Sequence, residues 1–150
     1  MPISDVCVRD VVVATKETTV QQAAALMRRH HVGDLVVVQE GTNGRKIPVG
    51  IITDRDIVVS VVAPALNGAV YTIGDLVTRE LVTVAEDQGV FETIQQMRMI
   101  GVRRMPVVDR AGGLVGIISV DDLIQLLSDE MSELAKLIAR EQVLETKSKL

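Results

Sequence analysis

The sequence is nearly devoid of aromatic residues: its 150 residues include one Tyr, one Phe and no Trp. This scarcity argues against a platform for single-stranded nucleic acid, where bases stack on aromatic side chains. It also argues against an aromatic cage for a quaternary ammonium group. Since 47% of the residues are hydrophobic, a disordered chain is excluded. The core must therefore be built from Val, Ile, Leu, Ala and Met.

Cysteine and positive charge are scarce as well. Cys7 is the only cysteine, which excludes an intramolecular disulfide and a multi-cysteine metal site, and we expect it to be a small buried apolar residue. The 16 Lys and Arg residues stand against 20 Asp and Glu residues, so the chain lacks the basic footprint of a nucleic-acid-binding protein.

The N-terminus has neither the basic nor the long apolar segment of a signal peptide. The most apolar stretch, 57–70, is interrupted by Pro64 and Gly68 and is shorter than the roughly 18 residues that a membrane helix needs. We therefore expect a soluble, cytoplasmic protein that has no nucleic-acid or membrane partner.

An internal repeat organises the chain. Ile3-Ser4-Asp5-Val6 returns 70 residues later as Ile73-Gly74-Asp75-Leu76. Val49-Gly50-Ile51-Ile52-Thr53 returns 66 residues later as Val115-Gly116-Ile117-Ile118-Ser119. The difference of four residues corresponds to a longer loop, Gly41-Thr42-Asn43-Gly44, in the first copy, and its Gly and Asn residues are typical of turns. The repeat predicts two units, 1–66 and 67–127.

Each copy predicts the element order β-α-β-β-α. A short extended piece, at 11–13 or 81–83, precedes a helix with one apolar face. Two β-branched runs then surround a turn, at 35–38 and 49–52 in the first copy and at 106–108 and 114–118 in the second. A second helix follows, from 54 to 62 and from 120 onwards. The predicted fold class is α/β (α+β), with two motifs related by pseudo-two-fold symmetry.

Residues 128–150 extend beyond the repeat. Met131, Leu134, Ile138 and Leu144 recur at helical spacing with charged residues between them, which predicts an amphipathic C-terminal helix. Such a helix can pack on its own domain or form a dimer contact, and the spacing leaves both possibilities open.

A hydroxyl and a carboxylate recur together after the last strand of each copy. Thr53-x-x-Asp56 and Ser119-x-x-Asp122 each follow a Val-Gly-Ile-Ile run and open a helix. One interpretation is structural, because Ser or Thr with an acidic residue three positions later resembles a capping box. The other is functional, because a helix N-terminus favours phosphate and a nearby carboxylate can accept both hydroxyls of a ribose. The spacing alone does not separate them.

The basic residues near these pairs differ between the copies. Arg103 and Arg104 precede a strand of the second copy, and Arg55 lies at the start of a helix in the first. Guanidinium groups bind phosphate bidentately, although a solvated surface charge is the alternative role for each of them. The positions equivalent to Arg103 and Arg104 are Gly33 and Asp34. The sequence therefore predicts two non-equivalent sites.

These strings resemble the signature of CBS motifs, named for cystathionine β-synthase. The resemblance rests on Val-Gly-Ile-Ile-Thr-x-x-Asp and Val-Gly-Ile-Ile-Ser-x-x-Asp, together with 32–38 and 102–109. Two motifs in tandem resemble a Bateman module, a regulatory unit that binds AMP, ADP, ATP, S-adenosylmethionine or sometimes NAD between its motifs. The resemblance covers roughly residues 1–127 and leaves the C-terminal helix outside it.

The resemblance also implies a role for each candidate residue. Ribose hydroxyls would be bound by Asp56 and Asp122, and ribose or phosphate would be contacted by Thr53 and Ser119. Phosphates would be bound by Arg103 and Arg104. The adenine would lie between the aliphatic side chains of Ile51, Ile117, Val32 and Val102. Gly33, Asp34 and Arg55 complete the candidate set, and Asp34 departs from the pattern in a way that would weaken a phosphate site or admit a different ligand.

The sequence thus predicts a regulatory adenine-nucleotide sensor, not an enzyme, that acts as a homodimer on a separate protein of unknown identity. No metal is expected, because the adjacent His30 and His31 could hardly reach one ion together. Two alternatives remain: a nucleotide-dependent hydrolase that uses the Asp residues, and a ligand-free dimerisation scaffold in which the hydroxyl–carboxylate pairs only cap helices.

Overall fold

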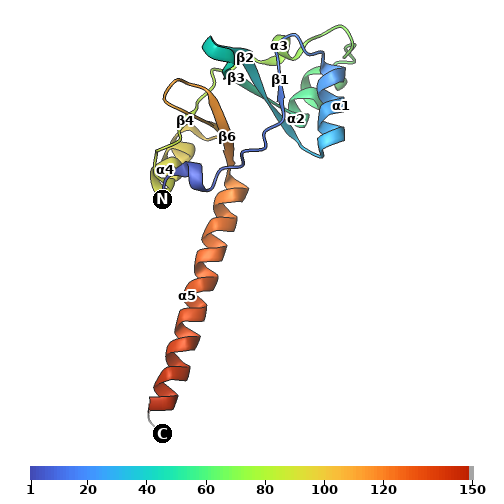
Figure 1. The fold of residues 1–150 in the computed structure, drawn as a ribbon. Helices are drawn as coiled ribbons and strands as arrows, with labels where there is room; N and C mark the ends of the chain where they lie inside the picture. Colours follow the sequence, from blue (N-terminus) through green and yellow to red (C-terminus); the bar gives the residue numbers. More distant parts are fainter. Residues whose placement is uncertain (149–150) are drawn as a thin grey trace.

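Two three-stranded sheets, one from each repeat, form the body of the molecule (Figure 1). The computed structural model describes residues 1–148. The first sheet has the order β1 (Val13–Ala14), β2 (Asp34–Glu40) and β3 (Lys46–Thr53). The second has the order β4 (Val84–Ala85), β5 (Arg104–Val108) and β6 (Leu114–Ser119). In both sheets the first pair of strands is parallel and the second pair is antiparallel.

The helices follow the same repeat. Each copy carries one helix before its hairpin, α1 (Val20–His30) and α4 (Val90–Ile100). After the hairpin, the first copy has α2 (Asp54–Ile57), which continues as a π-helix over Val58–Val62, and the second has α5 (Val120–Ser148). Shorter helices span Ile3–Asp5, Thr42–Gly44 and α3 (Ile73–Leu76). The predicted α/β fold with two β-α-β-β-α motifs is confirmed.

The short first strands lie later in the chain than predicted. Only Val13 and Ala14 pair with β2, where 11–13 had been expected, and only Val84 and Ala85 pair with β5. The Thr18 amide donates to the Thr15 carbonyl, and this turn ends the pairing of β1 with β2 directly after Ala14. These strands are therefore brief parallel contacts at the sheet edges.

The beginning of each sequence repeat packs against the other repeat. Ile3 is fully buried in the core that surrounds β5 and β6, and Ile73 is fully buried in the core that surrounds β2 and β3. The Ile3 amide donates to the Gln88 carbonyl at 2.7 Å, and the Ile73 amide donates to the Thr18 carbonyl at 2.8 Å. This reciprocal exchange ties the two halves into one folded body.

The exchange explains the glycine of the Val-Gly-Ile-Ile run. A Cβ atom on Gly116 would lie 2.6 Å from the Val8 carbonyl oxygen and 2.8 Å from the Cys7 sulfur. A Cβ atom on the equivalent Gly50 would overlap the side chain of Val77. Only glycine therefore allows the segment from the other repeat to cross the strand.

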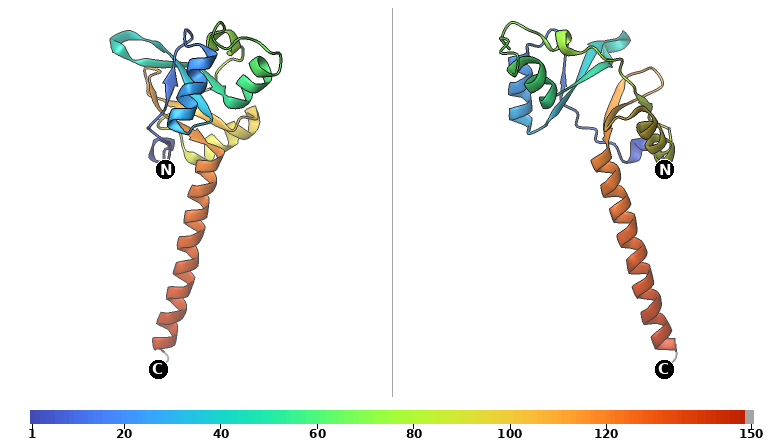
Figure 2. Two further views of the ribbon diagram at one scale, coloured as in Figure 1. Left: turned by 90° about the vertical axis from the view of Figure 1, so that its right-hand side faces the viewer. Right: turned by 180° about the vertical axis from the view of Figure 1, so that it is seen from behind.

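Helix α5 leaves the body as a single rod (Figures 1 and 2). Leu123 is buried and Leu126 is half-buried, but most of the apolar side chains that follow face solvent. At least half of the surface is exposed for Ile124, Leu127, Met131, Leu134, Leu137, Ile138 and Leu144. Most of the helix therefore does not pack on its own body. Among residues 1–148, no helix combines the length and the hydrophobicity needed to cross a bilayer.

Candidate functional site

Thr53 and Asp56 form a capping box at the start of α2. The Thr53 hydroxyl accepts a hydrogen bond from the Asp56 amide at 3.1 Å, and the Asp56 Oδ2 atom accepts one from the Thr53 amide at 2.9 Å. Within residues 1–148, the Asp56 Oδ1 atom takes part in no hydrogen bond. Capping therefore holds the carboxylate in place and leaves one oxygen available to accept a further bond.

Ser119 and Asp122 repeat this arrangement at the start of α5. The Ser119 hydroxyl accepts from the Asp122 amide at 3.2 Å. Asp122 Oδ2 accepts from the Ser119 amide at 3.1 Å and from the Ser119 hydroxyl at 2.8 Å. Its Oδ1 atom, like that of Asp56, accepts no hydrogen bond from the described residues. The structural interpretation of both pairs is therefore correct, and it is compatible with the functional one.

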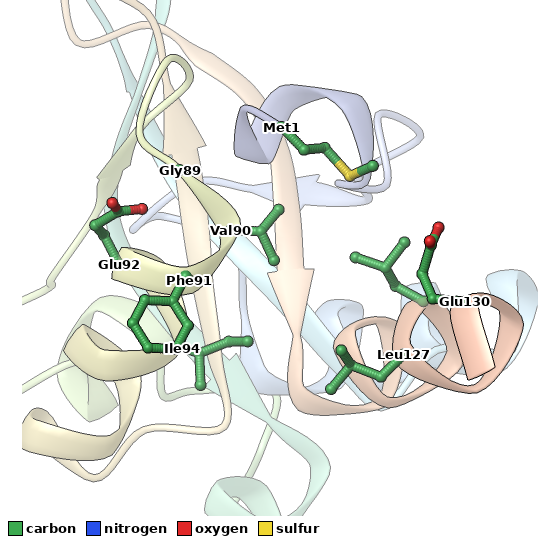
Figure 3. Close-up of a pocket in the computed structure, with 9 residues that line it drawn as sticks. Met1, Gly89, Val90, Phe91, Glu92, Ile94, Leu127 and Glu130 are labelled. Atoms are coloured by element: carbon green, nitrogen blue, oxygen red, sulfur yellow. The ribbon is translucent and has the colours of Figure 1, made fainter. Parts of the chain in front are cut away.

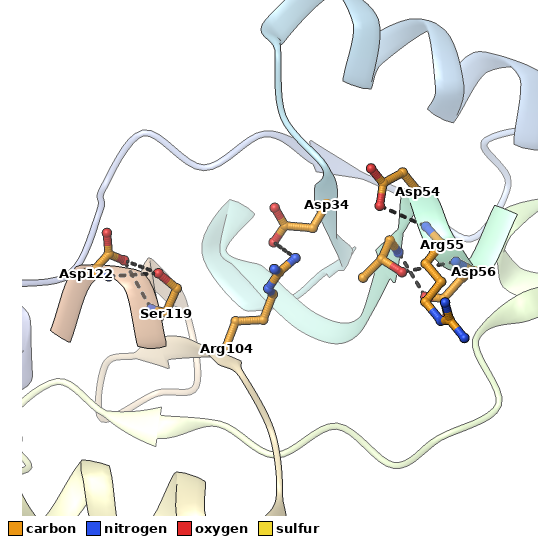
Figure 4. Close-up of polar contacts among 8 residues, drawn as sticks. Asp34, Asp54, Arg55, Asp56, Arg104, Ser119 and Asp122 are labelled. Atoms are coloured by element: carbon orange, nitrogen blue, oxygen red, sulfur yellow. Dashed lines mark hydrogen bonds and ion pairs between the residues drawn. The ribbon is translucent and has the colours of Figure 1, made fainter. Parts of the chain in front are cut away.

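An ion pair between the repeats lies between these two capping boxes (Figure 4). The Asp34 Oδ2 atom and the Arg104 guanidinium are 3.4 Å apart, and their side chains are 24% and 31% exposed, respectively. Asp34 pairs with Thr53 across β2 and β3, and Arg104 pairs with Ser119 across β5 and β6. Each charge is thus the cross-strand neighbour of one capping hydroxyl.

The sequence identified Asp34 and Arg104 separately but missed their contact. Their equivalence under the 70-residue offset was the available signal, because equivalent residues near a pseudo-two-fold axis meet each other. Strands β3 and β6 also touch across this boundary, and they carry the candidate adenine contacts Ile51 and Ile117, both half-buried. The other two aliphatic candidates, Val32 and Val102, are half-buried just before β2 and β5.

The backbone next to the capping boxes follows the pseudo-symmetry. The Asp54 amide donates to the Gly33 carbonyl at 2.9 Å, and the Val120 amide donates to the Arg103 carbonyl at 2.8 Å. The side chains do not follow it, because Asp54 of the first copy corresponds to Val120 in the second. A Cβ atom on Gly33 would lie 3.3 Å from the Asp54 carboxylate, so this approach is tight.

The two remaining arginine candidates are exposed. Arg103 lies 4.0 Å from Asp121, and the side chains of this pair are 73% and 84% exposed. Arg55 donates its backbone amide to the Asp54 carboxylate at 2.8 Å. Thr53 pairs across the sheet with Asp34 and is followed by Asp54, Arg55 and Asp56. Ser119 pairs with Arg104 and is followed by Val120, Asp121 and Asp122. The environment of Thr53 is therefore the more acidic of the two.

An apolar hollow lies away from the capping boxes, between α4 and α5 (Figure 3). It is an open groove of about 370 Å³ whose lining includes Val90, Phe91, Ile94 and Leu127. Sequence reasoning did not identify this groove. The exposed Phe91, one of two aromatic residues in the chain, was the available signal.

The described residues contain no cluster of three or more His, Cys, Asp or Glu side chains placed to hold a metal ion. His30 ends α1, and His31 follows as its C-cap with a left-handed backbone at φ 54°. Both side chains are exposed. Cys7 is half-buried, and this burial raises the pKa of its thiol.

The chain belongs to the CBS domain family. The family model for the CBS domain matches twice, at residues 3–63 and 73–129. An uncharacterised protein of Methanopyrus kandleri, MK0525, is 36% identical over 124 residues, which are 83% of this chain. The chain spans 61% of the length of that relative.

Solved structures share the fold of this tandem pair. One is the CBS domain pair of protein MJ0100 in complex with 5-methylthioadenosine and S-adenosyl-L-methionine, with a TM-score of 0.72 and 28% sequence identity. The alignment covers 87% of this chain and 98% of the MJ0100 chain. The CBS domain protein PAE2072 from Pyrobaculum aerophilum, complexed with AMP, has a TM-score of 0.71 at 26% identity. The alignment covers 82% of this chain and 90% of PAE2072. Tandem CBS proteins similar to this chain thus bind adenosyl compounds.

Proposed function

We propose that this chain is a regulatory module that binds adenosyl ligands next to the two capping boxes. The observation that carries the proposal is that Asp56 and Asp122 each use Oδ2 for capping and keep Oδ1 available. A carboxylate oxygen fixed in this way can accept ribose hydroxyls without a change of rotamer. The adenosyl ligands of similar CBS pairs support this assignment.

The charges around the two boxes favour different ligands. Arg104 beside Ser119, with Arg103 nearby, suits the phosphates of AMP, ADP, ATP or NAD, because guanidinium groups bind phosphate with charge-assisted hydrogen bonds. Asp34 beside Thr53 repels phosphate and suits a neutral or cationic adenosyl compound, such as one bearing a sulfonium group. Ile51, Ile117, Val32 and Val102 would contact the adenine.

Binding would act through a shift between two states of the ion pair. A phosphate at the Ser119 box competes with Asp34 for Arg104, so that the anionic ligand favours a state in which the contact between the repeats is broken. The signal would pass to a separate regulated protein, and the module would act as a cytoplasmic homodimer.

Calorimetric titration with AMP, ATP, NAD and S-adenosylmethionine tests the proposal. We expect saturable heat and a raised melting temperature with at least one of them, because a ligand bound only by the folded state stabilises it. Mass spectrometry of the purified protein under native conditions should show the same ligand retained. If neither signal is seen with any of the four compounds, the proposal is wrong and the ligand-free dimerisation scaffold is the remaining interpretation.

The same samples test the hydrolase alternative. In a non-catalytic module, ATP and NAD remain intact over hours in the presence of the protein. Steady formation of ADP, AMP or nicotinamide above a buffer control would identify an enzyme instead.

A further inference from the structure

The Asp34–Arg104 ion pair is shared between the two candidate sites (Figure 4). Asp34 lies opposite Thr53 in the first sheet, and Arg104 lies opposite Ser119 in the second. The Asp34 Oδ2 atom and the Arg104 guanidinium are 3.4 Å apart, and both side chains are half-buried. Each site therefore has a charged neighbour whose opposite charge stands beside the other site.

This position allows a change of charge at one site to act on the other. Water and salt screen half-buried charges less than exposed ones, so the ion pair transmits such a change over a short distance. While the pair is closed, the guanidinium offsets much of the negative field of Asp34 at the Thr53 box. Any group that draws on the positive charge of Arg104 leaves more of the Asp34 charge uncompensated.

We propose that the two sites are coupled through this ion pair, so that a phosphate-bearing ligand at the Ser119 box raises the affinity of the Thr53 box for a cationic adenosyl ligand. The coupling rests on the proposed function and adds the sign of the interaction between its two ligands. The sign is the same whether the phosphate pulls Arg104 away from Asp34 or binds its other nitrogen atoms, because both arrangements make the surroundings of Thr53 more negative.

The coupling acts in both directions, because linkage between two binding sites is reciprocal. A sulfonium group beside Asp34 weakens the attraction of that carboxylate for Arg104, and the guanidinium becomes more available to a phosphate. The same electrostatics oppose two phosphate ligands, because the second would face an Asp34 that has lost its opposite charge. One anionic and one cationic ligand together are therefore the favoured fully occupied state of the module.

Titration calorimetry with two matched ligands tests the sign. S-adenosylmethionine carries a sulfonium charge that S-adenosylhomocysteine lacks, whereas the adenosyl group is the same in both. With AMP present at a concentration that saturates its tighter site, we expect S-adenosylmethionine to bind about fivefold more tightly than without AMP. The affinity for S-adenosylhomocysteine should be the same with and without AMP.

Arg104→Gln should reproduce the effect of AMP in the absence of AMP. The variant removes the opposite charge of Asp34 permanently, so it should bind S-adenosylmethionine about fivefold more tightly than the wild type does. Asp34→Asn should still bind AMP but should lose the coupling. Lys136→Gln and Glu133→Gln remove the same charges from an exposed ion pair of α5 and are the matched controls, in which the coupling should persist.

The possible results separate the coupling from the binding function. If both ligands bind but neither changes the affinity for the other, or if AMP displaces S-adenosylmethionine, the coupling is wrong and the binding function stands. If only AMP binds, the Thr53 box does not select a cation, and the coupling is overturned as well. Coupling that persists in Asp34→Asn, or an unchanged affinity of Arg104→Gln for S-adenosylmethionine, would show that the ion pair does not carry it. If neither ligand binds, the proposed function itself fails.

Discussion

Asp34 and Arg104 occupy the same position in the two repeats and contact each other. Their side-chain atoms are 3.4 Å apart, and each is paired across a hairpin with a capping hydroxyl residue, Thr53 or Ser119. Opposite charges at one repeat position thus become an ion pair at the boundary between the repeats. The contact breaks the symmetry of the two candidate sites.

The ion pair makes Asp34 a competitor for any anionic ligand of Arg104. Asp34→Asn should strengthen AMP or ATP binding by about fivefold, because it removes about 1 kcal/mol of attraction between Asp34 and Arg104 that competes with the phosphate. Arg104→Gln should weaken binding by about 10- to 100-fold, since a charge-assisted hydrogen bond is lost. Calorimetric titration measures both. Arg110→Gln, in the exposed turn after β5, is the control, and equal losses in Arg104→Gln and Arg110→Gln would refute this role of Arg104.

The capping carboxylates allow capping to be separated from ligand binding. Asp56→Ala and Asp122→Ala should each lower the unfolding free energy by about 1 kcal/mol through loss of the cap, and each should weaken the ligand of its own site at least tenfold. Chemical denaturation and titration measure the two effects.

Asp75→Ala is the matched control for this experiment. The Asp75 carboxylate accepts from the Thr72 amide at 3.0 Å at the start of α3, so its loss should cost similar stability without changing affinity. If all three variants lose stability and none loses affinity, the boxes are helix caps only.

Gly116 should not tolerate even a methyl group. Its added Cβ would meet the backbone carbonyl of Val8, which cannot move without breaking the Val8–Ile117 bridge. Gly116→Ala should therefore lower the unfolding free energy by about 1–3 kcal/mol. Gly68→Ala is the control, because its nearest neighbours lie at 3.6 Å, an ordinary contact. Similar denaturation midpoints for the two variants would contradict this prediction, because they would mean that the segment of Cys7 and Val8 shifts at little cost in stability.

Asp109 should make the stability of the second hairpin depend on pH. Its carboxylate accepts the Ala111 and Gly113 amides, each at 2.9 Å, and these hydrogen bonds lower the pKa of Asp109. Because the folded pKa is below the unfolded one, the stabilisation is present above the usual Asp range and is lost as pH falls through the lowered pKa. The stability difference between wild type and Asp109→Ala should therefore shrink in acid, as denaturation between pH 7 and about pH 3 would measure. A difference that stays constant over this range would assign the effect to packing.

The repeat and its motifs predicted the two sheets and the capping pairs, because apolar periodicity and cap chemistry are local properties of the chain. Residues that meet across the repeats were not predictable in this way. The exchange of Ile3 and Ile73 between the cores depends on how the halves are placed, which periodicity does not encode. The contact of Asp34 with Arg104 is indicated only by the equivalence of the two positions under the 70-residue offset, not by apolar periodicity or cap chemistry.

The sequence also contains a signal that the second helix of the repeat and the C-terminal extension form one long helix, α5. No Gly or Pro occurs between Val120 and Ser148, so nothing in the sequence ends the second helix of the repeat at residue 127. The helix of the motif and the C-terminal extension are consequently one element.

Because α5 is one continuous helix, a change in its direction at the second capping box moves its far end. The first turn of α5 holds Asp122, and its 29 residues reach about 44 Å from there. A tilt of about 10° at Ser119 would carry the far end through about 8 Å, since displacement grows with the length of a rigid helix. A small displacement of the first turn of α5 at the second capping box thus becomes a several-fold larger displacement at the far end of the helix.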